Sequence, residues 1–191
     1  MANEPTLATA NPHADRVLSR DAADVDAVFR SHLEGALASG YRLASVILGN
    51  PADAEDATHD AIERAWRSRS SLRELERFEA WFQRIVVNAC RDRVRRRRSM
   101  PVFVEVRPTD APAGGSARSM RDPFADTAER DAVRAALSRI NVDQRAVVAM
   151  RFYLDLEIDE IARRLGTRPG TVKSRLHRGL KTLREAWEIE R

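Results

Sequence analysis

The sequence predicts an all-α protein with two small helical domains joined by a flexible linker. Apolar residues recur at spacings of three and four along most of the chain, which is the period of an α-helix. Proline and glycine interrupt this pattern over residues 99–125, and we find neither a β-rich block nor an internal repeat. We therefore expect a mobile tail over residues 1–20, a helical domain over 21–98, the linker over 99–125 and a second helical domain over 126–191.

The composition is that of a globular protein. The chain has 191 residues, of which 43% are hydrophobic, enough to build packed cores. Its formal net charge of +4 gives only weak support for a polyanionic partner, because the position of the charges matters more. The single cysteine, Cys90, excludes an internal disulfide and a CxxC motif. Because we find no signal peptide and no apolar run of the roughly 20 residues that span a bilayer, we expect a soluble cytoplasmic protein without membrane insertion.

Three helices are expected in the first domain. The first begins near Asp21 and ends before the helix-stopping residues 49–51; the face that we expect it to bury contains Val25, Val28, Phe29, His32, Leu33 and Ala36. The second covers residues 52–67 with a stripe formed by Ala54, Ala57, Ala61 and Ala65. The third covers residues 77–97, and its apolar side contains Phe78, Trp81, Phe82, Ile85 and Ala89. Together these helices can enclose a core.

Four helices are expected in the second domain, over residues 126–140, 143–152, 157–165 and 168–188. The last two form a helix-turn-helix, because Gly166 can end the first of them, Thr167 can cap the second and Pro169 is tolerated in a first turn. The buried stripe expected on the last helix contains Val172, Leu176, Leu180, Leu183 and Trp187.

The start of the last helix is rich in hydrogen-bond donors. Donors at this end of a second helix are typical of a helix that enters the major groove of DNA, although a solvated basic face would show the same charges. Arg175 has the position and the planar fork of a base contact, whereas Arg178 and Lys181 are expected to meet phosphates. The candidate DNA-binding set is Arg168, Gly170, Thr171, Lys173, Ser174, Arg175, His177, Arg178 and Lys181.

Two charged stripes occur in the first domain. Arg84, Asn88, Arg91 and Arg95 share one face of the third helix, which ends in six arginines among eight residues, a density that attracts phosphates or else belongs to a solvated helix end. Asp56, Asp60 and Glu63 form an acidic stripe on the second helix, which in isolation is usually solvated. Asp56 and His59 have half the pattern of a helical di-metal site, but we find no matching second half, so we expect no metal.

The segments EIDEIARRLGTRPGTVKSRLHRGLKTLRE, DAEDATHDAIERAWRS and FEAWFQRIVVNACRDRVRRRR resemble the bacterial sigma-70 family, in particular its extracytoplasmic-function (ECF) group. The resemblance covers most of residues 22–98 and 126–188, and it includes the order of the two domains and the linker between them. It implies a factor that binds core RNA polymerase and directs it to the −35 and −10 elements of promoters. Residues 21–98 would be the region 2 domain and residues 126–191 the region 4 domain.

The resemblance also assigns roles to residues. The helix-turn-helix would read the −35 element. The −10 element would be contacted, with one base extruded from the duplex, by Arg73, Arg77, Trp81, Arg84, Asn88, Arg91 and Arg95, although the apolar stripe favours a core position for Trp81 over base stacking. The clamp helices of the largest polymerase subunit would meet Asp56, His59, Asp60 and Glu63. Further implied partners are the polymerase flap, promoter DNA and an anti-sigma factor.

One departure from the family pattern and one rival function remain. The chain has His59-Asp60 where the family commonly has Gln-Glu, and the shorter Asp60 would weaken or alter the polymerase contact. A stand-alone helix-turn-helix regulator that binds duplex DNA as a dimer also fits the second domain, as does an adaptor with a vestigial DNA-binding helix. We find no P-loop, dinucleotide-binding, HExxH or GxSxG motif, so we expect no catalytic residue and no cofactor.

Overall fold

The computed structural model describes residues 12–72, 74–99, 133 and 135–189. Within these residues every regular element is a helix, which confirms the predicted all-α class. The chain groups into two compact units, residues 1–37 and 38–191, and helices of both predicted domains contribute to the second unit. Because most of the predicted linker lies outside the described residues, the domain boundaries at residues 98 and 126 stay predictions.

Helix α1 (Pro12–Leu48) begins earlier than the pattern indicated, because residues 12–20 are helical where a tail was expected. Phe29, Leu33 and Ala36 are buried as predicted. Val25 is 67% exposed and Val28 is exposed as well, so the buried face of α1 is narrower than its apolar residues suggest. His32 is also exposed, and its Nδ1 donates a hydrogen bond to the Val28 carbonyl oxygen at 2.9 Å.

The turn between α1 and α2 (Pro51–Arg67) follows the predicted stop signal. Gly49 takes a φ of 70°, which favours glycine, and the Asn50 side chain accepts a hydrogen bond from the Asp53 backbone nitrogen at 3.1 Å. Pro51 occupies the first turn of α2, where its missing N–H costs nothing. All four alanines of the predicted stripe are completely buried. These small side chains let α2 lie close to α3.

Helix α3 (Phe78–Ser99) follows two short 3-10 turns, η1 (Arg69–Ser71) and η2 (Leu75–Arg77). Its core side differs from the predicted one, since it is centred on Phe82, Val86 and Cys90. Trp81 and Ile85 are only half-buried, and the Trp81 ring lies 5.8 Å from that of Phe78. Burial raises the pKa of the Cys90 thiol to about 12, so this cysteine is a neutral core residue at physiological pH.

The C-terminal helices are α5 (Val142–Phe152), α6 (Ile158–Leu165) and α7 (Pro169–Ile189). A capping box begins α5: the Asn141 side chain accepts from the Gln144 nitrogen, and the Gln144 side chain accepts from the Asn141 nitrogen. Gly166 ends α6 in the left-handed conformation, with a φ of 62°, as predicted. Arg168, not Thr167, directly precedes α7, so the predicted capping role of Thr167 is not fulfilled.

The core face of α7 is formed by small residues more than by leucines. Val172, Gly179 and Ala186 are buried, whereas Leu180 is exposed and Leu176 and Leu183 are half-buried. Gly179 packs against α5, where an added Cβ would lie 3.2 Å from Val148 Cγ2. This close approach turns α7 by a fraction of a turn from the orientation that the leucine pattern predicts.

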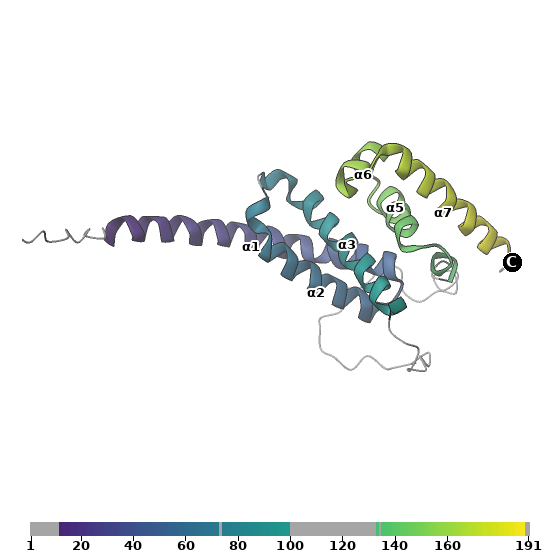
Figure 1. Cartoon of the computed structure of the whole chain (residues 1–191), viewed down its shortest axis with the longest axis horizontal. Helices are drawn as coiled ribbons and strands as arrows, with labels where there is room; N and C mark the ends of the chain where they lie inside the picture. Colours follow the sequence, from purple (N-terminus) through teal and green to yellow (C-terminus); the bar gives the residue numbers. More distant parts are fainter. Residues whose placement is uncertain (1–11, 73, 100–132, 134, 190–191) are drawn as a thin grey trace, which may run out of the picture. The chain divides into compact units, whose positions relative to one another are not determined.

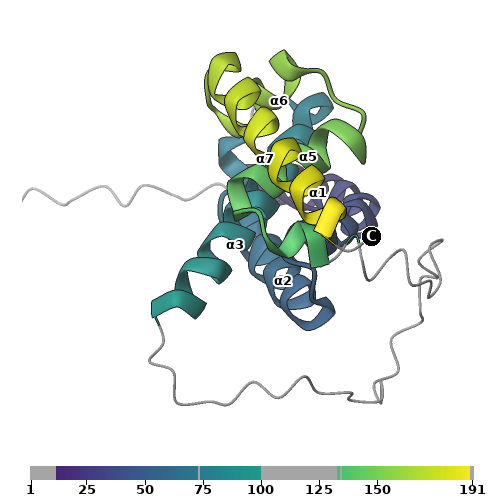
Figure 2. The same ribbon diagram turned by 90° about the vertical axis from the view of Figure 1, so that its right-hand side faces the viewer.

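Helix α3 occupies the centre of the second unit. It contacts α2 on one side and both α5 and α6 on another, and the two ribbon views agree on this order (Figures 1 and 2). Helices α5, α6 and α7 pack on one another (Figure 1). Among the described residues, no helix is both long enough and apolar enough to cross a membrane.

The packing of α1 on α3 generates a stability prediction. A Cβ at Gly40 would lie 2.8 Å from Cε1 of the completely buried Phe82, whereas one at Gly35 would meet nothing within 4 Å. We expect Gly40→Ala to lower the free energy of unfolding by about 1–3 kcal/mol through overpacking. The matched control Gly35→Ala should raise it by about 0.5–1 kcal/mol. Thermal or urea unfolding of both variants measures this, and equal effects would contradict the proposed contact.

Candidate nucleic-acid interface

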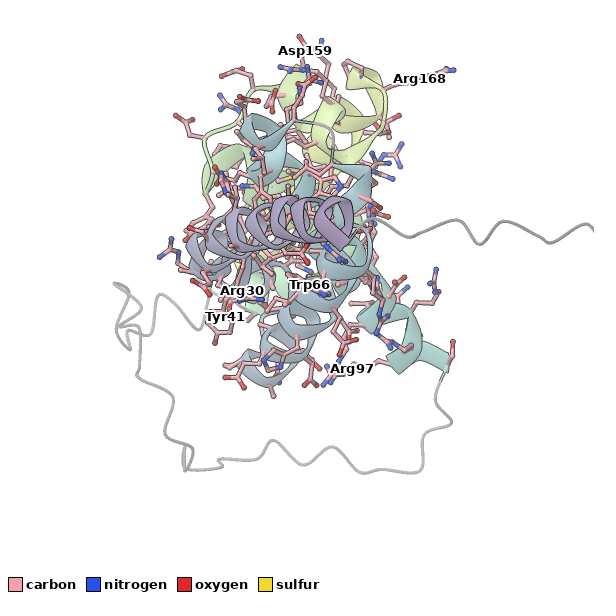
Figure 3. The ribbon with its side chains drawn as sticks, turned by 90° about the vertical axis from the view of Figure 1, so that its left-hand side faces the viewer. Arg30, Tyr41, Trp66, Arg97, Asp159 and Arg168 are labelled. Atoms are coloured by element: carbon pink, nitrogen blue, oxygen red, sulfur yellow. The ribbon has the colours of Figure 1, made fainter. Side chains whose placement is uncertain are left out.

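The exposed face of α7 is basic at its N-terminal end. Arg168, Gly170, Lys173, His177, Arg178 and Lys181 are exposed, and Figure 3 shows the Arg168 side chain extending outward at the start of α7. Thr171 and Ser174 are half-buried, and the Ser174 hydroxyl donates to the Thr171 carbonyl oxygen at 3.0 Å. Six of the nine predicted DNA-binding residues of this helix are therefore exposed to solvent, as recognition of a DNA groove requires.

Arg175 lies on a different side of α7 from these exposed residues. Its position falls between the buried Val172 and Gly179, on the side that packs against α5. The Arg175 side chain is 28% exposed, and its Nη2 lies 3.7 Å from Asp143 Oδ1 on α5. This geometry favours a role for Arg175 in holding α7 against α5, which differs from the base contact that its sequence position predicts.

Part of the predicted −10 stripe of α3 lies toward the C-terminal helices in this structure. Arg91 donates through Nε and Nη2 to Asp143 Oδ1 of α5, both at 2.7 Å, and its Nη1 donates to Asn88 Oδ1 at 3.0 Å. The Arg84 guanidinium lies over Gly166, where an added Cβ would come within 2.8 Å of Arg84 Nη2. Of the predicted DNA contacts, Arg91 is thus paired with α5, whereas Arg84 lies close to Gly166 and remains exposed.

A buried glutamine fixes α6 on α3. Gln83 is 2% exposed, and its Oε1 accepts from Arg164 Nη1 of α6 at 2.5 Å. The Gln83 amide nitrogen donates to Glu79 Oε1 at 3.1 Å, so both ends of the buried amide have partners. Arg164 also bonds Glu160, and this hydrogen bond lowers the pKa of Glu160. The contact between α3 and α6 is therefore polar and directional.

The arginine run at the end of α3 is neutralised largely by α2. Arg93 and Arg97 both pair with Asp53, at 3.0 and 2.6 Å, and Arg93 also bonds Asp56. Further along, Arg96 pairs with Asp60 at 2.6 Å. The density of this run predicts attraction for phosphates; in the structure, carboxylates of α2 already pair with three of its arginines.

These ion pairs change the meaning of the acidic stripe on α2. Two of its carboxylates, Asp56 and Asp60, are occupied by arginines of α3. The Glu63 side chain is 65% exposed and, among the described residues, pairs within its own helix with Arg67 at 2.6 Å. His59 is exposed beside it. Glu63 is therefore the member of the stripe that is most available to a protein partner, with the exposed His59 beside it.

The remaining predicted −10 residues are distributed around the start and the end of α3. Arg73 lies outside the described residues. Arg77 is exposed and pairs with Glu74 at 2.7 Å, and Arg95 pairs with Asp92 at 2.7 Å. Among the described residues, no group of three or more His, Cys, Asp or Glu side chains is arranged to hold a metal ion.

The structure also contains an apolar groove that the apolar periodicity did not predict. It measures about 830 Å³ and lies along α5 and α7. Phe152 and Tyr153 line it at the end of α5, together with Leu180 of α7, and Phe152 is 63% exposed. The apolar pattern of the last helix predicts Leu180 in the core, whereas in the structure Leu180 is 38% exposed and lines this groove.

Other residues missed from the sequence are Asp53, Gln83 and Asp143. Each is a polar residue whose partner lies on another helix, so no local pattern identifies it. The outer face of α7 was predictable because its residues are neighbours on one helix.

A helix-turn-helix with a basic, donor-rich outer face defines a DNA-binding protein, and the comparisons specify which kind. Residues 29–100 match Sigma-70 region 2, and residues 130–183 match Sigma-70, region 4. The chain is 36% identical over 155 residues to the ECF RNA polymerase sigma factor SigM of Mycobacterium tuberculosis, which covers 80% of this chain and 71% of that relative. It is 30% identical over 144 residues to the RNA polymerase sigma factor SigV of Bacillus subtilis, with coverage of 75% and 81%.

The fold is also similar to that of a solved sigma factor. The sigma factor RpoE from Bartonella quintana, solved in complex with the anti-sigma factor NepR, matches with a TM-score of 0.62 at 23% identity and covers 85% of this chain and 98% of its own. The chain belongs to the sigma-70 family, among the ECF RNA polymerase sigma factors. It is therefore a transcription initiation factor.

Proposed function

We propose that the chain binds core RNA polymerase and directs it to promoters through two separate DNA contacts. The exposed face of α7 would read the −35 element, and the region from η1 to the middle of α3 would recognise and help to open the −10 element. The observation that carries this proposal is the outward basic face of α7 on a helix-turn-helix, in the same chain as the Arg84–Asn88–Arg91 stripe. In this role the protein would have no active site and would work in the cytoplasm with the polymerase.

Two further surfaces fit contacts with the polymerase. The acidic stripe of α2 is proposed to meet the clamp helices of the largest subunit, with Glu63 and His59 as its accessible members. The apolar groove along α5 and α7 has the shape and the exposed aromatic side chains to take an apolar helix, which we assign to the flap. An anti-sigma factor would act by covering either of these surfaces. These assignments rest on the family resemblance together with the exposure of the residues.

Run-off transcription with purified core polymerase tests the proposed function. We expect the chain and core enzyme together to initiate from a promoter with −35 and −10 elements, and neither component to do so alone. A stand-alone dimeric regulator would instead give a symmetric footprint on duplex DNA without polymerase. That footprint, combined with no polymerase-dependent transcript, would overturn the proposal.

The polymerase contact can be tested at Glu63. We expect Glu63→Arg to weaken binding to core polymerase by about tenfold or more. The proposed partner surface is positively charged, and an arginine placed opposite it would be repelled. The fold should be unaffected, since the exposed pair with Arg67 contributes little to stability. The matched control is Asp159→Arg, which makes the same charge change at an exposed position of α6. Pull-down with core enzyme measures both, and equal binding by the two variants would contradict the assigned face.

The division of labour on α7 can be tested with two variants. We expect Lys173→Ala to relax the preference at one or two adjoining −35 positions, at a cost of about 1–3 kcal/mol, because Lys173 lies on the exposed face. Arg175→Ala should instead weaken all −35 sequences alike and lower the melting temperature, since it removes the contact with Asp143. The measurement is initiation from a panel of −35 variants. A changed preference with unchanged stability for Arg175→Ala would restore Arg175 as the base contact.

A further inference from the structure

A small basic cleft lies where the C-terminal end of α3 approaches α5. It has a volume of about 260 Å³, and four arginines and one carboxylate contribute to its lining: Asp53, Arg93, Arg97, Arg98 and Arg145. Arg97 is labelled at this end of α3 in Figure 3. None of the DNA or polymerase contacts proposed above uses the cleft, although charged side chains make up most of its lining.

The one carboxylate of the cleft is already fully engaged. The Asp53 side chain is 3% exposed, and its two oxygens accept from Arg93 Nε at 3.0 Å and from Arg97 Nη1 at 2.6 Å. Arg93 has a second partner in Asp56 outside the lining. The internal ion pairs therefore account for Arg93 and Arg97 and leave Arg98 and Arg145 without a carboxylate among the described residues.

Arg145 is an unfavourable residue in the free protein. Its side chain is half-buried against α3, and the buried Nε–H has no hydrogen-bond acceptor in the described residues. Burial lowers the pKa of Arg145, and repulsion from Arg98 lowers it further. A desolvated cation with an unsatisfied donor costs stability, and a second cation close by adds to that cost. An anion bound between the two arginines would reverse both effects.

We propose that this cleft binds a small phosphate-bearing anion between the guanidinium groups of Arg98 and Arg145. Guanidinium groups present planar pairs of donors that match phosphate oxygens, and partial burial strengthens each charge-assisted hydrogen bond. The volume suits a phosphate or diphosphate group, whereas the backbone of a duplex would remain outside the cleft. Because Arg98 belongs to α3 and Arg145 to α5, the bound anion links the two helices. It thereby stabilises the arrangement in which Asp143 holds Arg91.

The test uses the full chain in low-chloride buffer with inorganic pyrophosphate as the probe. Thermal unfolding and isothermal titration calorimetry should show a rise in melting temperature and saturable binding by the parent protein. Arg145→Met should raise the melting temperature without pyrophosphate, because an apolar side chain replaces a desolvated cation, and should weaken pyrophosphate binding by about tenfold or more. Arg98→Gln, at an exposed position where folding is not at risk, should weaken binding as well.

Controls separate a specific site from general attraction of anions. Arg163→Gln removes the same charge from an exposed position of α6 and should bind pyrophosphate like the parent. A single-stranded oligothymidine is then tested as a competitor of pyrophosphate. If it competes, and if Arg145→Met weakens its binding by the same factor, the phosphate belongs to a nucleic-acid backbone. If it does not compete, the ligand is a free small molecule. If Arg145→Met lowers the melting temperature, or if either Arg145→Met or Arg98→Gln binds pyrophosphate like the parent, the proposal is wrong.

Discussion

The ion pairs between α2 and the arginine-rich end of α3 are the constraint on which the second unit depends. Six arginines among eight residues would repel one another along a helix. Asp53, Asp56 and Asp60 of α2 meet three of these arginines, and the completely buried alanines of α2 allow the two helices to approach closely enough for these contacts. Asp53 is the member whose loss would be felt most, because it is buried and holds two cations. With this end of α3 fixed, its remaining faces can serve other contacts.

The polar side of α3 then carries the C-terminal helices. Gln83, Arg84 and Arg91 lie along one side of α3 and meet Arg164, Gly166 and Asp143. Asp143 faces both Arg91 of α3 and Arg175 of α7, which the sequence assigned to two different promoter elements. The contact with Asp143 Oδ1 occupies two of the three Arg91 nitrogens, and the third bonds Asn88. Directional polar contacts of this kind, in contrast to an apolar core, can separate without exposing a large hydrophobic surface.

The surfaces of the C-terminal helices divide by chemistry. The exposed side of α7 near Pro169 presents donors and positive charge, which suit DNA, whereas the groove along α5 and α7 presents Phe152 and Leu180, which suit an apolar protein segment. The cleft beside Arg145 differs from both surfaces, because its lining contains four arginines and only one carboxylate, Asp53. The close packing of Gly179 on α5 sets how α7 is turned, and so decides which of its residues belong to which surface.

The sequence by itself determined the all-α class, the helix stops at Gly49 and Gly166, the alanine stripe of α2, the helix-turn-helix and the family. These features follow from neighbours along the chain, because helical periodicity and capping act within a few residues. Only the tertiary structure decided that Arg175 lies near Asp143, that Leu180 is exposed, that three arginines of the run pair with α2, and that Asp143 holds Arg91. Each of these features depends on a partner from another helix. Each also depends on how far a helix is rotated about its own axis, and apolar periodicity does not resolve this rotation when small residues such as Gly179 form the contact.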